Sequence, residues 1–389
     1  MKNLYQGDRG ILVSYMQLAL KRAGYPLLVD GIFGTNTCRA LADFLQTDRT
    51  PDRICVVDRS VWEKLLPYLR GYVTEEGENR ILFEDPVTAV EVPYTSLLTA
   101  AVIDGLRVRY PFLKSGEIGK SVMGKPISYL EIGNGEKEVF YNASFHANES
   151  ITTPVLLKFA EEYAQAYEKG TALYGVPAAE LFEEYRLFLV PLVNPDGVDL
   201  VNGLLTDGGY YRRAQQIASD YPAIPFPSGW KANIEGIDLN LQFPAGWENA
   251  KRIKYAQGYT KPAPRDYVGE APLTAPESEA VYAFTRSHDF RLILAYHTQG
   301  EVIYWKYLDY EPARSYEIAQ YFGRVSGYTV EETPAQSGYA GYKDWFIQEY
   351  DRPGYTIEAG MGENPLPMSD FAGIYRDNAG ILLGGMTQI

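Results

Sequence analysis

The sequence predicts an α/β protein: a mixed, largely parallel sheet flanked by helices on both faces and preceded by a small three-helix module. Three observations predict it. Strand-like and helix-like segments alternate from position 93 to the end, the central strands are almost wholly apolar, and the segment 1–72 contains only helix-like segments. Apolar runs such as RLFLVPLV and RLILAY are typical of strands covered on both faces. Because 46% of the 389 residues are hydrophobic, disorder is excluded.

The segment 1–72 is expected to form the helical module. Helices are predicted over residues 10–23, 38–46 and 59–72. The first of them ends at Gly24, and Thr35 can cap the second after the turn-rich segment VDGIFGTNT. The segment 73–92 that follows is polar and acidic in its first half. It is predicted to be a linker to one large domain at 93–389.

The large domain contains the alternating elements. Strands are predicted over residues 127–133, 137–144, 186–193, 291–297, 301–305, 327–332 and 353–359. Helices are predicted over residues 150–169, 275–287, 311–325 and 341–350, with one more near the C-terminus. Ligands gather at the carboxyl ends of strands in such folds, so polar residues at those ends are the candidates for a functional site.

Net charge and apolar run length exclude two classes of partner. Asp and Glu outnumber Lys and Arg by 50 to 36, a formal net charge of -14. This acidic balance argues against binding to nucleic acid and to anionic lipid, because both partners require a basic protein surface. The longest apolar runs are strand-sized, and no signal peptide is visible at the start. A location in the cytoplasm or in a sporulation compartment is therefore expected.

Only two cysteines occur, Cys38 and Cys55. Two unbonded buried thiols are the expectation, because no disulfide framework is present; a single disulfide is the alternative.

Histidine is scarce, and two of the three lie at strand ends. His146 and Glu149 follow the strand KEVFYNAS, and His297 ends the strand RLILAYH. Two histidines and one glutamate form the ligand set of a catalytic zinc whose fourth position stays open. His288, at a helix end, is expected to be a surface or capping residue.

Glu358 lies at the end of the apolar segment PGYTIEAG. Burying a carboxylate there is costly unless a cation or proton compensates it. Beside a metal-bound water it would act as the general base; a solvent-facing edge glutamate is the alternative.

Motifs in the segment 4–70 resemble the three-helix type of bacterial peptidoglycan-binding domain. They are Gly7, Gly10, Val13, Gln17, Leu20, Gly24-Tyr25, the segment VDGIFG at 29–34, and Phe44. The resemblance implies binding of wall glycopeptide and no chemistry.

The rest of the chain resembles the zinc carboxypeptidase family (M14). The motifs occur in order as His146-x-x-Glu149, Asn194-Pro195-Asp196-Gly197, Trp230-Lys231, Gly236-Ile237-Asp238-Leu239-Asn240, His297 and Glu358. The resemblance implies one Zn²⁺ per chain held by His146, Glu149 and His297, with Glu358 activating the metal-bound water. The family has an arginine after the tryptophan to meet the oxyanion; Lys231 keeps the charge but lacks the planar fork.

Other positions depart from the exopeptidases of this family. The Asn-Arg pair that grips a terminal carboxylate is Asn240-Leu241 here, so the bidentate anchor is missing. The place of the mobile tyrosine falls at Gln336, with Tyr339 three residues away as the substitute.

The segments GIDLNLQFPAGW, WKAN, AYHTQGEVIYW and GYTIEAG, taken together, most resemble the bacterial branch that cleaves γ-D-glutamyl bonds to a diamino acid in wall peptides. Peptidoglycan or muropeptides would be the partner, met in the cytoplasm, in a sporulation compartment, or at the wall after release. Arg212 and Arg213, expected in a loop before Trp230, are candidates to bind its carboxylates. The alternatives are a carboxypeptidase that trims a terminal residue and a non-catalytic wall-binding protein.

Overall fold

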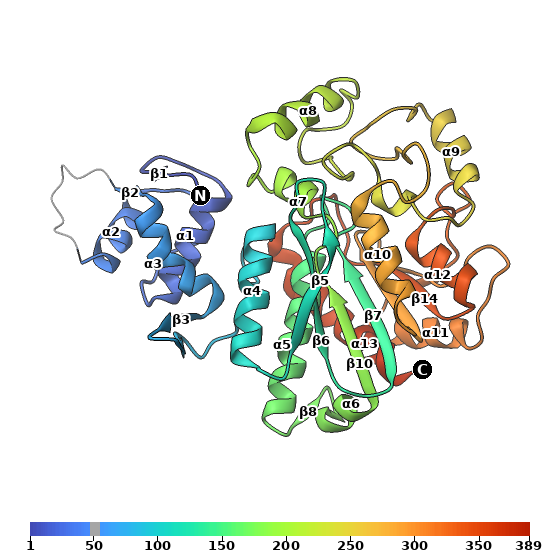
Figure 1. The fold of residues 1–389 in the computed structure, drawn as a ribbon, viewed down its shortest axis with the longest axis horizontal. Coiled ribbons are helices and arrows are strands. Elements are labelled where there is room, and N and C mark those ends of the chain that lie inside the picture. The colour runs from blue at the N-terminus through green and yellow to red at the C-terminus, as the bar shows by residue number, and fades with distance from the viewer. Residues whose placement is uncertain (47–54) are drawn as a thin grey trace.

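The computed structural model describes residues 1–46 and 55–389, and in them one mixed sheet forms the centre of the molecule (Figure 1). Its strand order is β13-β12-β14-β11-β7-β10-β6-β5. The strands are β5 (Lys114–Lys120), β6 (Pro126–Ile132), β7 (Lys137–Ala143), β10 (Tyr185–Val190), β11 (Leu292–His297), β12 (Val302–Tyr304), β13 (Thr329–Glu331) and β14 (Gly354–Glu358). The four adjacent strands β14, β11, β7 and β10 run parallel. The predicted fold class is confirmed.

Helices cover both faces of this sheet because its central strands are apolar on both sides. On β7, Val139 and Tyr141 pack in one cluster and Phe140 in the other. The helices of this region are α4 (Ser96–Arg109), α5 (Thr152–Glu168), α6 (Ala178–Glu184), α7 (Pro195–Val201), α8 (Gly208–Ser219), α9 (Trp247–Ala256), α10 (Pro276–Arg286), α11 (Ser315–Ser326), α12 (Tyr342–Tyr350) and α13 (Phe371–Thr387). Helices α5 and α13 contact one face, whereas α12 contacts the other. Within the described residues, no helix is both long and apolar enough to cross a membrane.

Minor elements complete the chain. Two further pairs of strands are short, β1 (Leu4–Tyr5) with β2 (Val56–Val57) and β8 (Ala172–Leu173) with β9 (Val176–Pro177). Single 3₁₀ turns lie at Leu239–Leu241 and Met368–Asp370.

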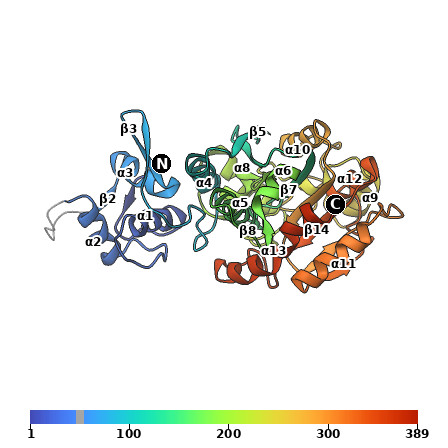
Figure 2. The ribbon, with the colours of Figure 1, turned by 90° about the horizontal axis from the view of Figure 1, so that it is seen from below.

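Three helices form a unit at the N-terminal end, drawn in blue in Figures 1 and 2. They are α1 (Ile11–Arg22), α2 (Thr35–Phe44) and α3 (Arg59–Arg70). Gln17 of α1 fixes the VDGIFG turn, donating to Asp30 Oδ1 and accepting from Gly31 N, both at 2.8 Å. Thr35 is not the predicted cap, because Gly34 occupies the N-cap position and no side chain caps the helix.

Cys38 and Cys55 form a disulfide in this unit, so the expectation of two unbonded thiols is wrong. The α-carbon atoms of the two residues lie 5.7 Å apart, within the range that a disulfide spans. The sequence showed no such proximity, because it depends on a tertiary contact: strand β2, which directly follows Cys55, pairs with β1.

The segment predicted as a linker is more ordered than expected. It contains the hairpin of β3 (Tyr72–Glu75) and β4 (Glu78–Ile81). Beyond it, Arg22 donates to the carbonyl of Val87 at 2.7 Å, and the hydroxyl of Tyr15 donates to the carbonyl of Pro93 at 2.9 Å. The helical unit is therefore fastened to the chain that leads into α4, against which α3 packs.

Candidate active site

Three parallel strands end at one edge of the sheet and bring the predicted residues together. His146 and Glu149 lie just after β7, His297 is the last residue of β11, and Glu358 is the last residue of β14. In the parallel register His297 is directly opposite Glu358. Residues as far apart in the chain as His146 and Glu358 thus meet in one site, as the strand-end argument predicted.

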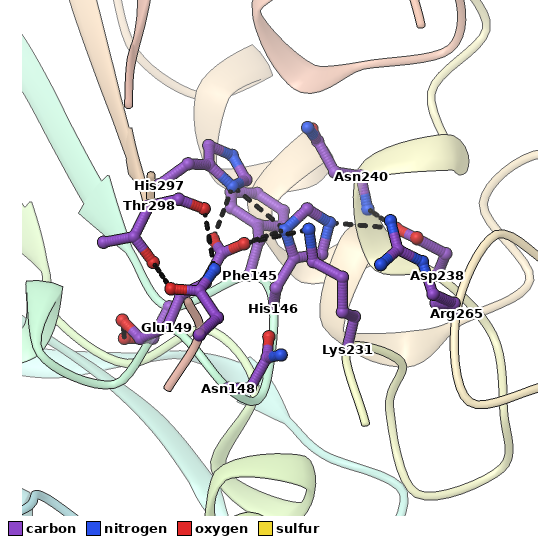
Figure 3. A network of polar contacts seen from close by, with 12 residues as sticks. Phe145, His146, Asn148, Glu149, Lys231, Asp238, Asn240, Arg265, His297 and Thr298 are labelled. Atoms are coloured by element: carbon purple, nitrogen blue, oxygen red, sulfur yellow. Dashed lines mark hydrogen bonds and ion pairs between the residues drawn. The ribbon is translucent and has the colours of Figure 1, made fainter. Parts of the chain in front are cut away.

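His146, Glu149 and His297 form a buried cluster that could hold a metal ion. Glu149 reaches both histidines, with Oε1 2.9 Å from His146 Nδ1 and Oε2 2.9 Å from His297 Nδ1. The two Nδ1 atoms lie 3.2 Å apart (Figure 3). Ligand atoms about 2.0–2.1 Å from one tetrahedral zinc lie about 3.4 Å from each other, so this donor set fits zinc closely.

A fourth residue orients the first ligand. Asp238 Oδ1 lies 3.1 Å from His146 Nε2, and its other oxygen accepts from the backbone N–H of Asp266 at 3.1 Å. A carboxylate on the outer nitrogen fixes the tautomer that presents Nδ1 to a metal. The sequence placed Asp238 in a motif, but only the tertiary structure shows that it contacts a residue 92 positions away.

The charges in the cluster call for a cation. Burial by itself would lower the pKa of His146, but Glu149 and Asp238 outweigh it and raise this pKa to about 9. Burial would raise the pKa of Glu149, but the positive charges of His146 and Lys231 outweigh it and hold this pKa well below its ordinary value. A divalent ion held by His146, Glu149 and His297 would supply positive charge beside these carboxylates.

Lys231 and Glu358 flank the cluster. The ammonium of Lys231 lies 3.1 Å from Glu149 Oε1, and its side chain is 17% exposed. Burial opposes its charge, yet Glu149 outweighs burial and raises the pKa of Lys231 above its ordinary value. For Glu358, burial raises the pKa, and the negative charge of Glu149 adds to the effect against the opposing influence of His297. The lysine stays cationic while the carboxyl binds a proton more readily than an exposed glutamate.

Two cavities open beside the cluster and share part of their walls. The smaller, of about 240 Å³, extends toward Asn240, Leu241 and the start of α12. The larger, of about 530 Å³, extends toward Asn148 and Asn364. A chain-like substrate could therefore occupy both cavities along the wall that they share.

Of the predicted substrate residues, Asn240 lines the smaller cavity, where its Oδ1 accepts from Tyr342 N at 3.0 Å. Tyr339 lines neither cavity; it packs beside Gly246 and against Tyr307. The neighbouring Gln336 is exposed. In this structure Tyr339 therefore contacts Tyr307 and does not form part of either cavity wall.

Arg212 and Arg213 were predicted to lie in a loop, but the structure places both on helix α8. Ala214, Ile217 and Ala218 form the buried face of this helix, which leaves both arginines exposed. Neither lines a cavity next to the metal cluster. His288, the third histidine, contacts the carbonyl of Phe284 at 2.8 Å near the end of α10 and takes no part in the site.

Two site residues were missed by the sequence reasoning. Tyr304 and Arg265 line both cavities together with Lys231 and Glu358. Tyr304 ends β12 and pairs with Thr356 on β14, so the two-residue alternation of a predicted strand could have placed it on the side of Glu358. Arg265 lies in an irregular segment, where no periodicity could have revealed it.

The comparisons identify the family. A family model described as zinc carboxypeptidase, Peptidase M14, matches residues 99–379. The chain belongs to the zinc carboxypeptidase family. It is therefore a zinc metallopeptidase, as predicted, and the buried cluster of two histidines and a glutamate could bind the one zinc ion.

Two relatives of this member of the zinc carboxypeptidase family are bacterial. It is 48% identical over 285 residues to gamma-D-glutamyl-L-diamino acid endopeptidase 1 of Lysinibacillus sphaericus, covering 73% of this chain and 70% of that protein. It is 44% identical over 276 residues to the uncharacterized protein YqgT of Bacillus subtilis (strain 168), covering 70% and 72%. Among solved structures, carboxypeptidase A from Helicoverpa armigera has a TM-score of 0.57 at 18% identity, covering 90% of this chain and 94% of that one, and shares the fold.

Proposed function

We propose that this zinc peptidase hydrolyses the bond between γ-D-glutamate and the diamino acid of peptidoglycan stem peptides. The observation that carries the proposal is the similarity to the Lysinibacillus sphaericus endopeptidase, at 48% identity over 285 residues. The site supports it at one position, because the apolar Leu241 stands where the exopeptidases that this chain resembles have the arginine that grips a terminal carboxylate. Two adjoining cavities that share Lys231 and Glu358 suit cleavage within a peptide.

The candidate zinc ligands, Glu358 and Lys231 have different roles in the proposed hydrolysis. Zinc held by His146, Glu149 and His297 supplies Lewis acidity when it is bound. Glu358 takes the proton of the attacking water and delivers it to the leaving amine, a role for which its raised pKa is suited. Lys231, which stays protonated, faces the negative charge that develops on the scissile carbonyl oxygen.

The direct test is cleavage of the tetrapeptide L-Ala-γ-D-Glu-diaminopimelate-D-Ala by the zinc-loaded chain. We expect release of L-Ala-D-Glu, detected by mass spectrometry, and its loss in the presence of a metal chelator. Release of D-Ala alone, abolished by amidation of the peptide terminus, would instead establish the carboxypeptidase alternative. No product with zinc bound would leave the non-catalytic alternative.

We also propose that the N-terminal helical unit, residues 1–72, is a peptidoglycan-binding module. A cavity of about 590 Å³ lies between the VDGIFG turn and α2, lined among others by Leu28, Asp30, Asn36 and Arg39. Polar groups beside an exposed apolar side chain suit an amphipathic glycopeptide. Because Arg22 and Tyr15 tie the unit to the large domain, a bound wall strand would stay close to the metal site.

Leu28, which is 76% exposed in this cavity, provides the test. We expect Leu28→Glu to lower the fraction of protein that cosediments with insoluble peptidoglycan several-fold, because it places a charge where an apolar contact is needed. Leu308→Glu, at a 49% exposed leucine of the large domain, is the matched control. Equal binding of both variants and the unaltered chain would rule this cavity out.

A further inference from the structure

The two cavities beside the metal cluster meet at a small group of side chains. Lys231, Tyr304, Glu358 and Arg265 line both of them. Lys231 and Glu358 have assigned roles at the scissile bond. Arg265 has none, although it lies at the same junction and carries a positive charge in a chain of net charge -14.

The structure holds Arg265 firmly through its inner nitrogen. Its Nε donates to Asp266 Oδ2 at 2.6 Å, while Lys254 binds the other oxygen of Asp266 at 2.5 Å. The backbone N–H of Asp266 in turn donates to Asp238, the residue that orients His146. Arg265 is thus positioned relative to the metal cluster by a short chain of contacts, and Figure 3 shows it beside Asp238.

The outer end of the same side chain is free. Across residues 1–46 and 55–389, its two terminal nitrogens have no hydrogen-bond partner, and the side chain is 44% exposed. A guanidinium anchored through Nε presents those two nitrogens as a fork that matches a carboxylate. Leu241, on the wall of the smaller cavity, cannot compete for that ligand.

We propose that Arg265 binds a free carboxylate of the substrate next to the scissile bond and thereby sets specificity. This inference rests on the proposed function. A γ-linked glutamyl residue keeps its α-carboxylate about 5 Å from the scissile carbonyl carbon, within reach of the wall that both cavities share. A diamino acid such as diaminopimelate carries a second carboxylate on the other side of the bond. Arg265 serves as the fork that the site lacks at Leu241.

The experiment compares three peptides with the zinc-loaded chain and with Arg265→Met. The first is L-Ala-γ-D-Glu-diaminopimelate-D-Ala, the second has the glutamyl α-carboxylate amidated, and the third has lysine in place of diaminopimelate. We expect the unaltered chain to prefer one free carboxylate over its neutral counterpart by about 10- to 100-fold in kcat/KM. Arg265→Met should lose that preference by slowing only the peptides that carry the recognised carboxylate, chiefly through KM. These are the first and third peptides if Arg265 binds the glutamyl carboxylate, and the first and second if it binds that of diaminopimelate.

If Arg265→Met no longer distinguishes the first peptide from the second, the glutamyl α-carboxylate is the ligand of Arg265. If it no longer distinguishes the first peptide from the third, the ligand is the side-chain carboxylate of diaminopimelate. Arg265→Lys keeps the charge without the fork and should retain part of the preference. Arg252→Met, at an exposed arginine of α9 that lines neither cavity, is the matched control and should behave like the unaltered chain. If Arg265→Met slows all three peptides by one factor, or if its preference equals that of the unaltered chain, the inference is wrong.

Failure of the proposed function can be distinguished from failure of this inference. If the unaltered chain cleaves none of the peptides, the proposed function fails. Calorimetric titration of the zinc-loaded Glu358→Gln chain with the free and amidated peptides, with and without Arg265→Met, then tests carboxylate binding alone. Equal affinities in all four titrations would overturn the role of Arg265.

Discussion

Glu358→Gln is expected to lower kcat on the wall tetrapeptide by about 10²- to 10⁴-fold while zinc stays bound. The amide has the size of the carboxylate but cannot take the proton of the attacking water or pass it on to the leaving amine. Glu358 lies opposite His297 in the register of β14 with β11, so it adjoins the ligands without belonging to the metal cluster. Turnover should therefore be lost without loss of the metal.

Three measurements check this expectation: kcat, zinc content per chain, and the melting temperature. Glu349→Gln, an identical change at an exposed residue of α12, is the control and should leave all three unchanged. A Glu358→Gln chain with near-normal kcat would remove Glu358 from the reaction. A loss of zinc in step with the loss of activity would assign it to metal binding instead.

Lys231→Met is expected to lower kcat by about 10²- to 10³-fold with a smaller change in KM. The ammonium is protonated and largely buried beside Glu149, where a fixed positive charge acts more strongly on a developing oxyanion than it would in water. Methionine keeps the apolar stem and removes only the charge.

Lys231→Arg should recover most of this activity, to within about tenfold of the unaltered chain, because it restores the charge. Lys169→Met, at an exposed lysine that follows α5, serves as the control. Because Lys231 contacts the candidate metal ligand Glu149, zinc content is measured for each variant. Equal losses in the arginine and methionine variants would show that the amine's geometry matters and its charge does not.

The seven strands predicted from the sequence all appear, and the central ones, β7, β10, β11 and β14, are largely buried apolar runs. Strand β5 and helix α8 were missed for the opposite reason. The edge strand β5, KSGEIGK, contains no fully buried residue, and only three of the residues in α8 are buried. Weakly buried elements have little apolar periodicity, so their structure depends on contacts made by the rest of the chain.

By itself the sequence determined the fold class, the candidate metal ligands and the position of Glu358 at a strand end. Strand ends and short motifs encode these features locally, and parallel pairing then brings the strand ends to one edge. Only the tertiary structure decided the Cys38–Cys55 disulfide, the contact of Asp238 with His146, and the place of Arg265 between the two cavities. These features depend on which loops return to the same point in space, which no local pattern of residues specifies.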